Sequence, residues 1–284
     1  MKMDDSTRLV ARHARAALVS MEKPSLRAVL EEQYAACNHR DWIHPDPLEV
    51  VYRYESERDR EVVGLIAACL AYGRVGHILR NLDRVLEVLG PSPHECLLRA
   101  DARRLNRRLE GFKHRWTTAE ELVAFLLGIA SVLNRYGSLE RCFLERHRQD
   151  AESTVPGLIE FVRALRGSGA PTSLLSAPEK GSACKRLHLY LRWMVRCDDV
   201  DPGCWRGVSP SQLIVPLDTH MHRIARSLGM TTRKQANLAA AEDATRAFRV
   251  LSPEDPVRYD FSLTRLGIRG DLDLDEFLRK CQGL

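Results

Sequence analysis

Apolar residues recur every three or four positions along almost the whole chain, which is the spacing of amphipathic helices. The segment 56–73 is apolar on all sides and predicts a central buried helix that stops at Gly73. Alternating strand patterns are nearly absent, and 213–217 comes closest to one. The pattern predicts helices over 24–37, 56–73, 75–90, 117–137, 153–167, 184–196, 219–229, 237–251 and 255–267.

The predicted helices are separated by short turns rich in Gly, Pro and Asp, as in a compact helical array. The longest irregular stretch is 197–217. We therefore expect an all-α fold, a two-lobed helical array with a cleft between the lobes. Residues 1–22 are expected to be a leader segment or helix, and 23–284 a single bilobal domain.

Composition is that of an ordinary globular protein, with 44% hydrophobic and 29% charged residues among 284. No apolar run approaches the length of a membrane span, and the N-terminus lacks the pattern of a secretory signal. The eight cysteines are dispersed and form no C-x-x-C pair, which predicts reduced thiols in the cytoplasm and no metal site. We expect no cofactor, and a monomer.

The acidic run at 271–277 predicts the capped start of a last helix, because it lacks the Gly and distal Glu of an EF-hand loop.

The positive charge is carried mostly by arginine. The formal net charge is +5, and only seven of the 43 basic residues are lysines. Two of the seven, Lys180 and Lys185, lie close together in the chain. Because lysine can lose its proton and arginine cannot, only lysine serves as an amine nucleophile.

A single carboxylate, Asp218, stands between the apolar stretch 214–217 and a helical pattern that begins at Thr219. Two interpretations are open. Asp218 is an N-cap, whose side chain accepts hydrogen bonds from the first N–H groups of the helix. Alternatively, the same cap fixes an acid at a site of chemistry.

The segment 173–196 predicts a helix-hairpin-helix. One helix is expected to end near Leu175, a turn with the sequence PEKGSA to follow, and a second helix to start at about Ala183. Such a turn presents free N–H groups to a phosphate, and Lys180, Lys185 and Arg186 add positive charge. These contacts hold a nucleic acid without reading its sequence.

The order of hairpin, helix and L-D-T-H-M-H-R-I at 217–224 resembles the helix-hairpin-helix DNA glycosylase superfamily, whose signature reads V-D-T-H-x-x-R-V. The usual hairpin of the superfamily, L-P-G-V-G-x-K, is not kept, since Ala183 stands where the Lys is expected and the iron–sulfur cysteines are absent. The archaeal 8-oxoguanine glycosylases are more similar, with K-T-I-V-F-A-V-K-M matching 185–193. The chain also resembles a bacterial family of uncharacterised activity that carries SACKRLxLxLRWMVR and PLDTHxHRIA.

This resemblance implies base-excision repair of double-stranded DNA, with removal of an oxidised purine similar to 8-oxoguanine and with or without AP-lyase activity. Lys185 would be the nucleophile, and Asp218, in the loop 214–220, would stabilise the sugar cation. The residues expected to contact DNA are Lys180, Gly181, Ser182, Arg186, His220 and His222. The residues expected to form the base pocket or to act as a wedge are Tyr72, Arg74, Trp193 and Trp42.

Several alternatives remain open at this stage. His220 and His222 are two residues apart on a helix and do not share a face, so a metal pair is disfavoured. A capping or packing role is favoured for His220, and a solvent-facing or phosphate-facing role for His222. The basic and aromatic segment 112–116 also suits nucleic acid. The protein as a whole could be a non-catalytic helix-hairpin-helix nucleic-acid-binding protein, or an unrelated helical scaffold.

Overall fold

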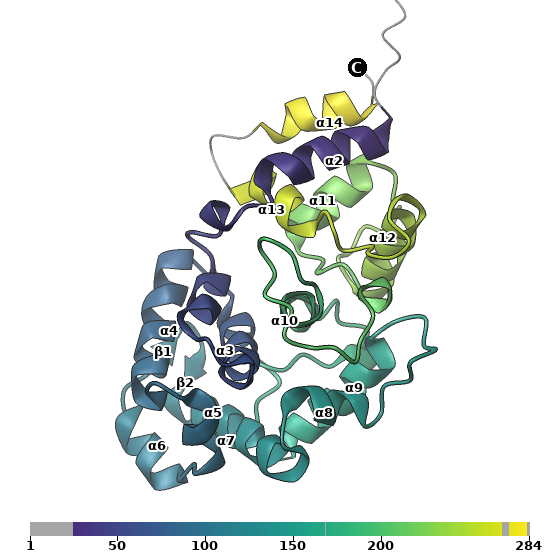
Figure 1. The fold of residues 1–284 in the computed structure, drawn as a ribbon. Coiled ribbons are helices and arrows are strands. Elements are labelled where there is room, and N and C mark those ends of the chain that lie inside the picture. Colours follow the sequence, from purple (N-terminus) through teal and green to yellow (C-terminus); the bar gives the residue numbers. More distant parts are fainter. Residues whose placement is uncertain (1–24, 168, 269–272, 283–284) are drawn as a thin grey trace, which may run out of the picture.

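The computed structural model describes residues 25–167, 169–268 and 273–282. Helices dominate it, and they lie in two groups with helix α10 between them (Figure 1). The all-α prediction is therefore confirmed. The leader predicted for 1–22 lies outside the described residues.

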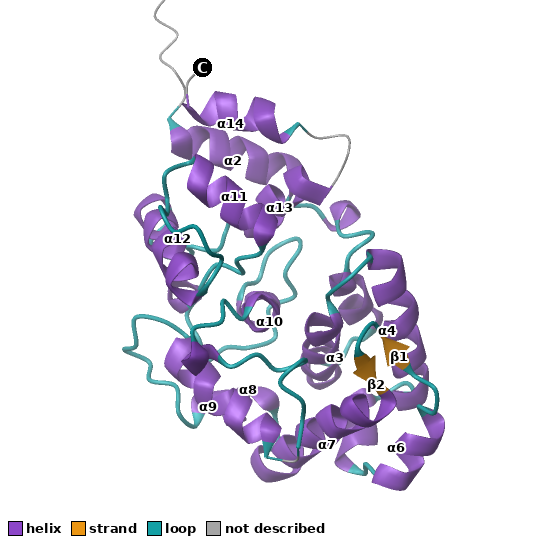
Figure 2. Ribbon diagram, turned by 180° about the vertical axis from the view of Figure 1, so that it is seen from behind, coloured by secondary structure: helices purple, strands orange, loops and turns teal. Residues whose placement is uncertain are grey.

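The first group of helices contains the middle of the chain. After the short 3-10 helices η1 (Arg40–Trp42) and η2 (Pro47–Arg53), its elements are α3 (Glu57–Leu70), α4 (Val75–Leu89), α5 (Pro93–Leu98), α6 (Ala102–Arg108), β1 (Lys113–His114), β2 (Thr117–Thr118), α7 (Ala119–Tyr136), α8 (Leu139–Leu144) and α9 (Val155–Arg166). Figure 2 shows the two small strands within this group. Strand β1 contacts α4, and β2 continues into α7. This antiparallel pair was not predicted, because two-residue strands leave no alternating pattern.

The second group joins the two ends of the described chain. Its elements are α2 (Leu26–Cys37), α11 (Thr219–Ser227), α12 (Leu238–Leu251), α13 (Asp260–Ile268) and α14 (Leu274–Gln282). Helix α13 contacts both α2 and α11, so residues far apart in the sequence lie side by side (Figure 1). Asp273 accepts hydrogen bonds from Asp275 and Glu276 at the start of α14, as expected of a capped helix.

Helix α3 is the buried helix that its all-round apolar pattern predicted, and it packs against α10. It begins at the N-cap Ser56 and ends at Leu70, and the chain then turns through Gly73, whose φ is +100°. Glycine suits this turn because a side chain is strained at such a φ. The capping box predicted for 117–137 is also present, formed by Thr118 and Glu121 at the start of α7.

Helix α10 (Lys185–Val195) is anchored by buried ion pairs. Arg192 Nε lies 3.1 Å from Asp201 Oδ1, and Arg192 Nη1 lies 2.6 Å from Asp260 Oδ2. One turn further on, Arg196 pairs with Asp201 and, at 2.8 Å, with Asp255. Breaking a buried pair leaves an uncompensated charge in the core, so this network fixes α10 against the loop 197–217 and the start of α13.

Three predictions about helix boundaries are wrong. The segment before the hairpin contains turns at 172–175 and the 3-10 helix η3 (Pro178–Lys180), so no α-helix ends near Leu175. Helix α10 begins at Lys185, two residues later than expected, because Cys184 before it takes the left-handed conformation with φ +45°. Helix α13 begins at Asp260 instead of 255, after turns at 253–259.

The long irregular stretch 197–217 is held in place by side-chain contacts. Trp205 donates from Nε1 to Glu61 Oε2, 3.1 Å away. The same carboxylate accepts from the backbone N–H groups of Leu139 and Glu140 at the start of α8. A loop of this length stays ordered because its polar groups find partners in the core.

Candidate functional site

The structure brings Lys185 and Asp218 together. Lys185 is the first residue of α10 and Asp218 is the N-cap of α11. Lys185 Nζ lies 3.8 Å from Asp218 Oδ2, and the two side chains are 31% and 27% exposed. An amine and a carboxylate from separate segments therefore meet at a position that solvent reaches.

The carboxylate of Asp218 has two functions at once. Its Oδ1 accepts a hydrogen bond of 2.9 Å from the backbone N–H of Met221, which caps α11. Its Oδ2 faces Lys185. The two interpretations of this residue are thus compatible, because capping uses one oxygen and fixes the direction of the other.

Lys185 and Asp218 line one cavity of about 330 Å³, which we call the Lys185 cavity. Its walls come from the segment 45–47, from the turn after α3 with the start of α4, and from α10, α11 and α13. The lining residues are Pro45, Asp46, Pro47, Ala71, Gly73, Val75, Ile78, Lys185, Leu189, Arg192, Pro216, Asp218, His220, Asp260, Thr264 and Arg265. The volume and the mixture of apolar and polar walls are those of a small-molecule site.

A buried acid lies in the wall of the Lys185 cavity. Asp260 is 4% exposed, and burial raises the pKa of its carboxyl group, against the opposing charge of Arg192. Its Oδ2 accepts from Arg192, whereas Oδ1 has no hydrogen-bond partner among the described residues. An unused buried acceptor next to a cavity is a place for a ligand donor, because leaving it unpaired costs free energy.

Only one of these additional lining residues could be recognised in the sequence. Arg192 interrupts an otherwise apolar run in α10, which marks a buried charge with a partner. No such pattern in the sequence distinguishes Asp46, Asp260 and Arg265. Arg265 lies 2.5 Å from Asp46 through Nη2, so these two segments are joined by a contact that only the fold creates.

The hairpin before α10 is exposed at its tip. Gly181 has a left-handed φ of +77°, and Lys180 and Gly181 are both exposed. Ser182 Oγ accepts from the N–H of Cys184. The N–H groups of the first α10 residues have no acceptor within the helix, as at any helix start, so they and Lys180 can bind a phosphate.

Arg186 points inward and not toward the hairpin surface. Its Nη1 donates to the carbonyl of Cys69 and its Nη2 to that of Ser173, both at 2.5 Å. Its guanidinium also lies 4.9 Å from the ring centre of Tyr72. These hydrogen bonds connect the end of α3 to the segment before the hairpin. Arg186 thus stabilises the fold instead of contacting a phosphate as expected.

The two histidines of α11 differ. His220 is exposed, lines the Lys185 cavity and packs so closely on Gly267 that a side chain there would meet Nδ1 at 2.9 Å. His222 is buried, with Nε2 3.0 Å from the carbonyl of Arg233. The phosphate-facing role expected of His222 is therefore wrong.

The aromatic residues proposed for a base pocket are scattered. Trp193 is 0% exposed in the core and is not available to a ligand. Trp42 packs against the core, and its carbonyl accepts from Arg265, at the edge of the Lys185 cavity. Tyr72 and Arg74 line a second cavity of about 640 Å³.

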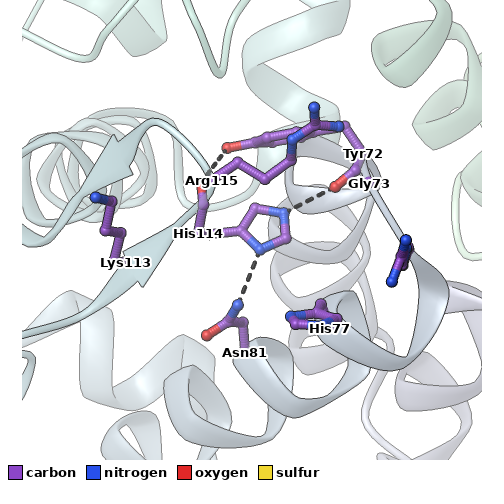
Figure 3. Close-up of a pocket in the computed structure, with 8 residues that line it drawn as sticks. Tyr72, Gly73, His77, Asn81, Lys113, His114 and Arg115 are labelled. Carbon is purple, nitrogen blue, oxygen red and sulfur yellow. Dashed lines mark hydrogen bonds between the residues drawn. The ribbon is translucent and has the colours of Figure 1, made fainter.

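This second cavity, which we call the Arg115 cavity, shares one lining residue, Gly73, with the Lys185 cavity. Figure 3 shows the Arg115 side chain extending beside Tyr72, and His114 bonded to Tyr72 and Asn81. The basic and aromatic segment 112–116 supplies one wall, so its composition was an early sign of this surface.

Comparisons with known proteins give a family and no activity. A family model described as a protein of unknown function, DUF2400, matches residues 46–269. The chain belongs to this family. No curated protein and no solved structure matches it. The matched span contains Lys185, Asp218 and every lining residue of the Arg115 cavity.

The part of the chain that the structure describes has neither a membrane-spanning helix nor a group of metal ligands. None of the described helices has the length and apolar character needed to cross a membrane. Within 25–167, 169–268 and 273–282, no three His, Cys, Asp or Glu side chains are grouped as metal ligands would be. None of the eight cysteines forms a disulfide.

Proposed function

We propose that the protein is a DNA glycosylase with AP-lyase activity that removes an oxidised purine from double-stranded DNA, acting as a monomer. The observation that carries the proposal is the 3.8 Å approach of Lys185 Nζ to Asp218 Oδ2 inside one solvent-accessible cavity. The exposed hairpin tip at Lys180–Gly181, next to this cavity, supports a duplex held by its phosphates.

The chemistry begins with a proton. An amine attacks only when it is uncharged, so the Lys185 ammonium, whose side chain is 31% exposed, first loses a proton to solvent. Nζ then forms a bond to C1′ of the sugar while the bond from C1′ to the base breaks. The base leaves with the electron pair and is protonated by solvent or by a nearby acid. Opening of the sugar ring gives a Schiff base, from which the strand can be cleaved.

The carboxylate also acts on the transition state. Breaking an N-glycosidic bond builds positive charge on the sugar, and a fixed negative group nearby stabilises that charge. Asp218 is fixed because its other oxygen is bound by the N–H of Met221. The cap of α11 thus orients the acid before the substrate arrives.

The base would be extruded from the duplex into the Lys185 cavity, at a cost of a few kcal/mol. Asp260 Oδ1 offers a buried acceptor without a partner among the described residues. An oxidised purine of the 8-oxoguanine type carries a ring N–H at N7 that guanine lacks. This donor and the free acceptor are complementary, which favours an oxidised purine over an intact one.

Borohydride trapping tests the proposal directly. Reduction of the Schiff base leaves a covalent protein–DNA adduct that runs slowly on a denaturing gel. Wild-type protein should trap on a duplex with 8-oxoguanine or an abasic site, and Lys185→Gln should not. The matched control is Lys234→Gln, which removes a lysine from an exposed turn outside both cavities and should trap normally.

Trapping by Lys185→Gln at the wild-type rate would remove Lys185 from the nucleophile role. Duplex binding by the wild type without trapping or excision on any lesion would instead favour a non-catalytic nucleic-acid-binding protein. Absence of DNA binding even at low salt would point to a helical scaffold.

A further inference from the structure

The hairpin of β1 and β2 forms one wall of the Arg115 cavity, and a large aromatic residue at its tip is exposed to solvent. Trp116 is 59% exposed, and it follows Arg115, which has a left-handed φ of +54°. The Trp116 ring stacks on Tyr72, with ring centres 5.3 Å apart and an angle of 16° between the planes. The Arg115 guanidinium lies 4.4 Å from the Trp116 ring centre. The Trp116 ring therefore has Tyr72 stacked against it and the Arg115 guanidinium over it, and it is still more than half exposed.

Hydrogen bonds hold this hairpin against the end of α3. His114 Nδ1 accepts from Asn81 Nδ2 at 2.9 Å, and its Nε2 donates to the carbonyl of Tyr72 at 3.1 Å. The Tyr72 hydroxyl donates in turn to the carbonyl of His114 and lies 2.6 Å from Thr117 Oγ1 (Figure 3). Burial lowers the pKa of His114, so the neutral ring has the one donor and one acceptor that these partners need. The exposed ring is thus carried on a rigid support.

The walls of the Arg115 cavity are positive. Arg74, Lys113 and Arg115 line it together with Tyr72, Gly73, His77, Asn81 and His114, and no acidic residue is among these. None of the three cations has a carboxylate within ion-pair distance in the described part of the chain, unlike the paired Arg192 and Arg196. Arg74 is also the N-cap of α4, so the cavity lies beside the positive end of that helix dipole.

We propose that the Arg115 cavity binds an unpaired nucleotide of a DNA strand. Its base stacks on Trp116 at the edge of the cavity, in place of the Arg115 guanidinium, and its phosphate lies among Arg74, Lys113 and the displaced Arg115. Aromatic stacking combined with a basic groove is how proteins bind single strands without reading their sequence. The proposal takes its partner, DNA, from the proposed function, but it does not depend on excision. Gly73 lines both cavities, so a nucleotide bound in the Arg115 cavity lies near the Lys185 cavity.

Tryptophan fluorescence provides the test. Trp193 and Trp205 are 0% and 3% exposed, so quenching by a stacked base reports mainly on Trp116, and Trp42→Phe removes the remaining partly exposed ring. Titration with a short oligothymidylate should quench Trp42→Phe protein. Anisotropy of a labelled oligonucleotide, which needs no tryptophan, should show that Trp116→Ala weakens binding roughly ten- to hundredfold. Lys113→Gln should lower the slope of log affinity against log salt by about 0.7.

All titrations are repeated in Lys185→Gln protein, which separates this inference from the proposed function. The fold-loss of oligothymidylate affinity caused by Trp116→Ala is expected to be the same in Lys185→Gln protein as in wild type. If wild-type protein forms no borohydride adduct but its oligonucleotide binding still depends on Trp116, the proposed enzyme activity is refuted and the nucleotide-binding inference stands. If trapping succeeds while Trp116→Ala binds the oligonucleotide as tightly as wild type, this one falls alone. Thermal unfolding of Trp116→Ala at the wild-type temperature is the control for folding. Lys234→Gln should keep both affinity and salt slope.

Two further outcomes overturn the inference. The first is oligonucleotide binding by Trp42→Phe without quenching, which would place the strand elsewhere. The second is equal affinity for thymidine monophosphate and for the oligonucleotide, which would assign the cavity to a free nucleotide instead of a strand.

Discussion

Three substitutions of Asp218 separate its structural role from its chemical one. One oxygen of this carboxylate accepts from the N–H of Met221, and the other lies 3.8 Å from Lys185 Nζ. Asp218→Asn and Asp218→Ser each keep an oxygen that can cap α11 and remove the charge. Asp218→Ala removes both the cap and the charge.

The expected effects on stability follow from these contacts. Loss of an N-cap costs about 1 kcal/mol. The ion pair is partly exposed and screened by solvent, so it contributes about 0.2–1 kcal/mol. The free energy of unfolding should therefore fall by roughly 1–2 kcal/mol in Asp218→Ala and by less than about 1 kcal/mol in Asp218→Asn and Asp218→Ser. For a chain of this size, each kcal/mol lowers Tm by about 2–4 °C.

The expected effects on chemistry run differently. If the charge of Asp218 stabilises the sugar cation, all three variants should lose about 10²–10³-fold in the single-turnover rate of borohydride trapping. Rates are measured with enzyme in excess over a lesion duplex, and Tm by calorimetry on the same preparations. Trapping by Asp218→Asn at the wild-type rate would reduce Asp218 to a helix cap. Equal Tm values for Asp218→Ala and Asp218→Asn would refute the capping argument.

Three further predictions concern stability and the border between the cavities. Burial lowers the pKa of His188 to about 4 from 6.5, so the folded state keeps this ring neutral where the unfolded chain protonates it. The free energy of unfolding should therefore fall by up to about 3 kcal/mol as pH falls from 6.5 to 4. Urea unfolding of His188→Leu should lack that part of the pH dependence. Gly73→Ala places a Cβ 3.0 Å from Arg115 Cδ at a φ of +100°, and should cost about 1–3 kcal/mol in the same assay while displacing Arg115 and weakening oligonucleotide binding. Arg192→Leu leaves Asp260 buried without its cation, and should destabilise the fold by about 3–5 kcal/mol; a smaller loss than Gly73→Ala would contradict the account of the buried network.

Much of the fold could be predicted because helix formation is a local property of sequence. Helices α3, α4, α7, α10 and α12 were expected within a few residues of their observed bounds. Errors occurred where backbone conformation depends on a single residue or on tertiary contacts. Cys184 in the left-handed region delays the start of α10, and no propensity predicts that conformation for cysteine.

The candidate site was predicted only in part, for a related reason. Lys185 and Asp218 could be chosen from their residue types and from the helix starts around them. The inward course of Arg186, the burial of His222 and the core position of Trp193 could not be anticipated. A helical pattern shows which face is apolar, but the partners of that face belong to other segments.

The sequence by itself determined the helical class, the positions of most helices and the pair of residues on which the proposed chemistry depends. Only the tertiary structure decided that these two residues share a cavity, that Asp260 leaves an acceptor beside it, and that Trp116 stands exposed above a second, cationic cavity. The reason is physical. Local periodicity and capping act between residues a few positions apart, whereas cavities and buried ion pairs arise where distant segments pack, and that packing is set by the sum of many contacts across the whole chain.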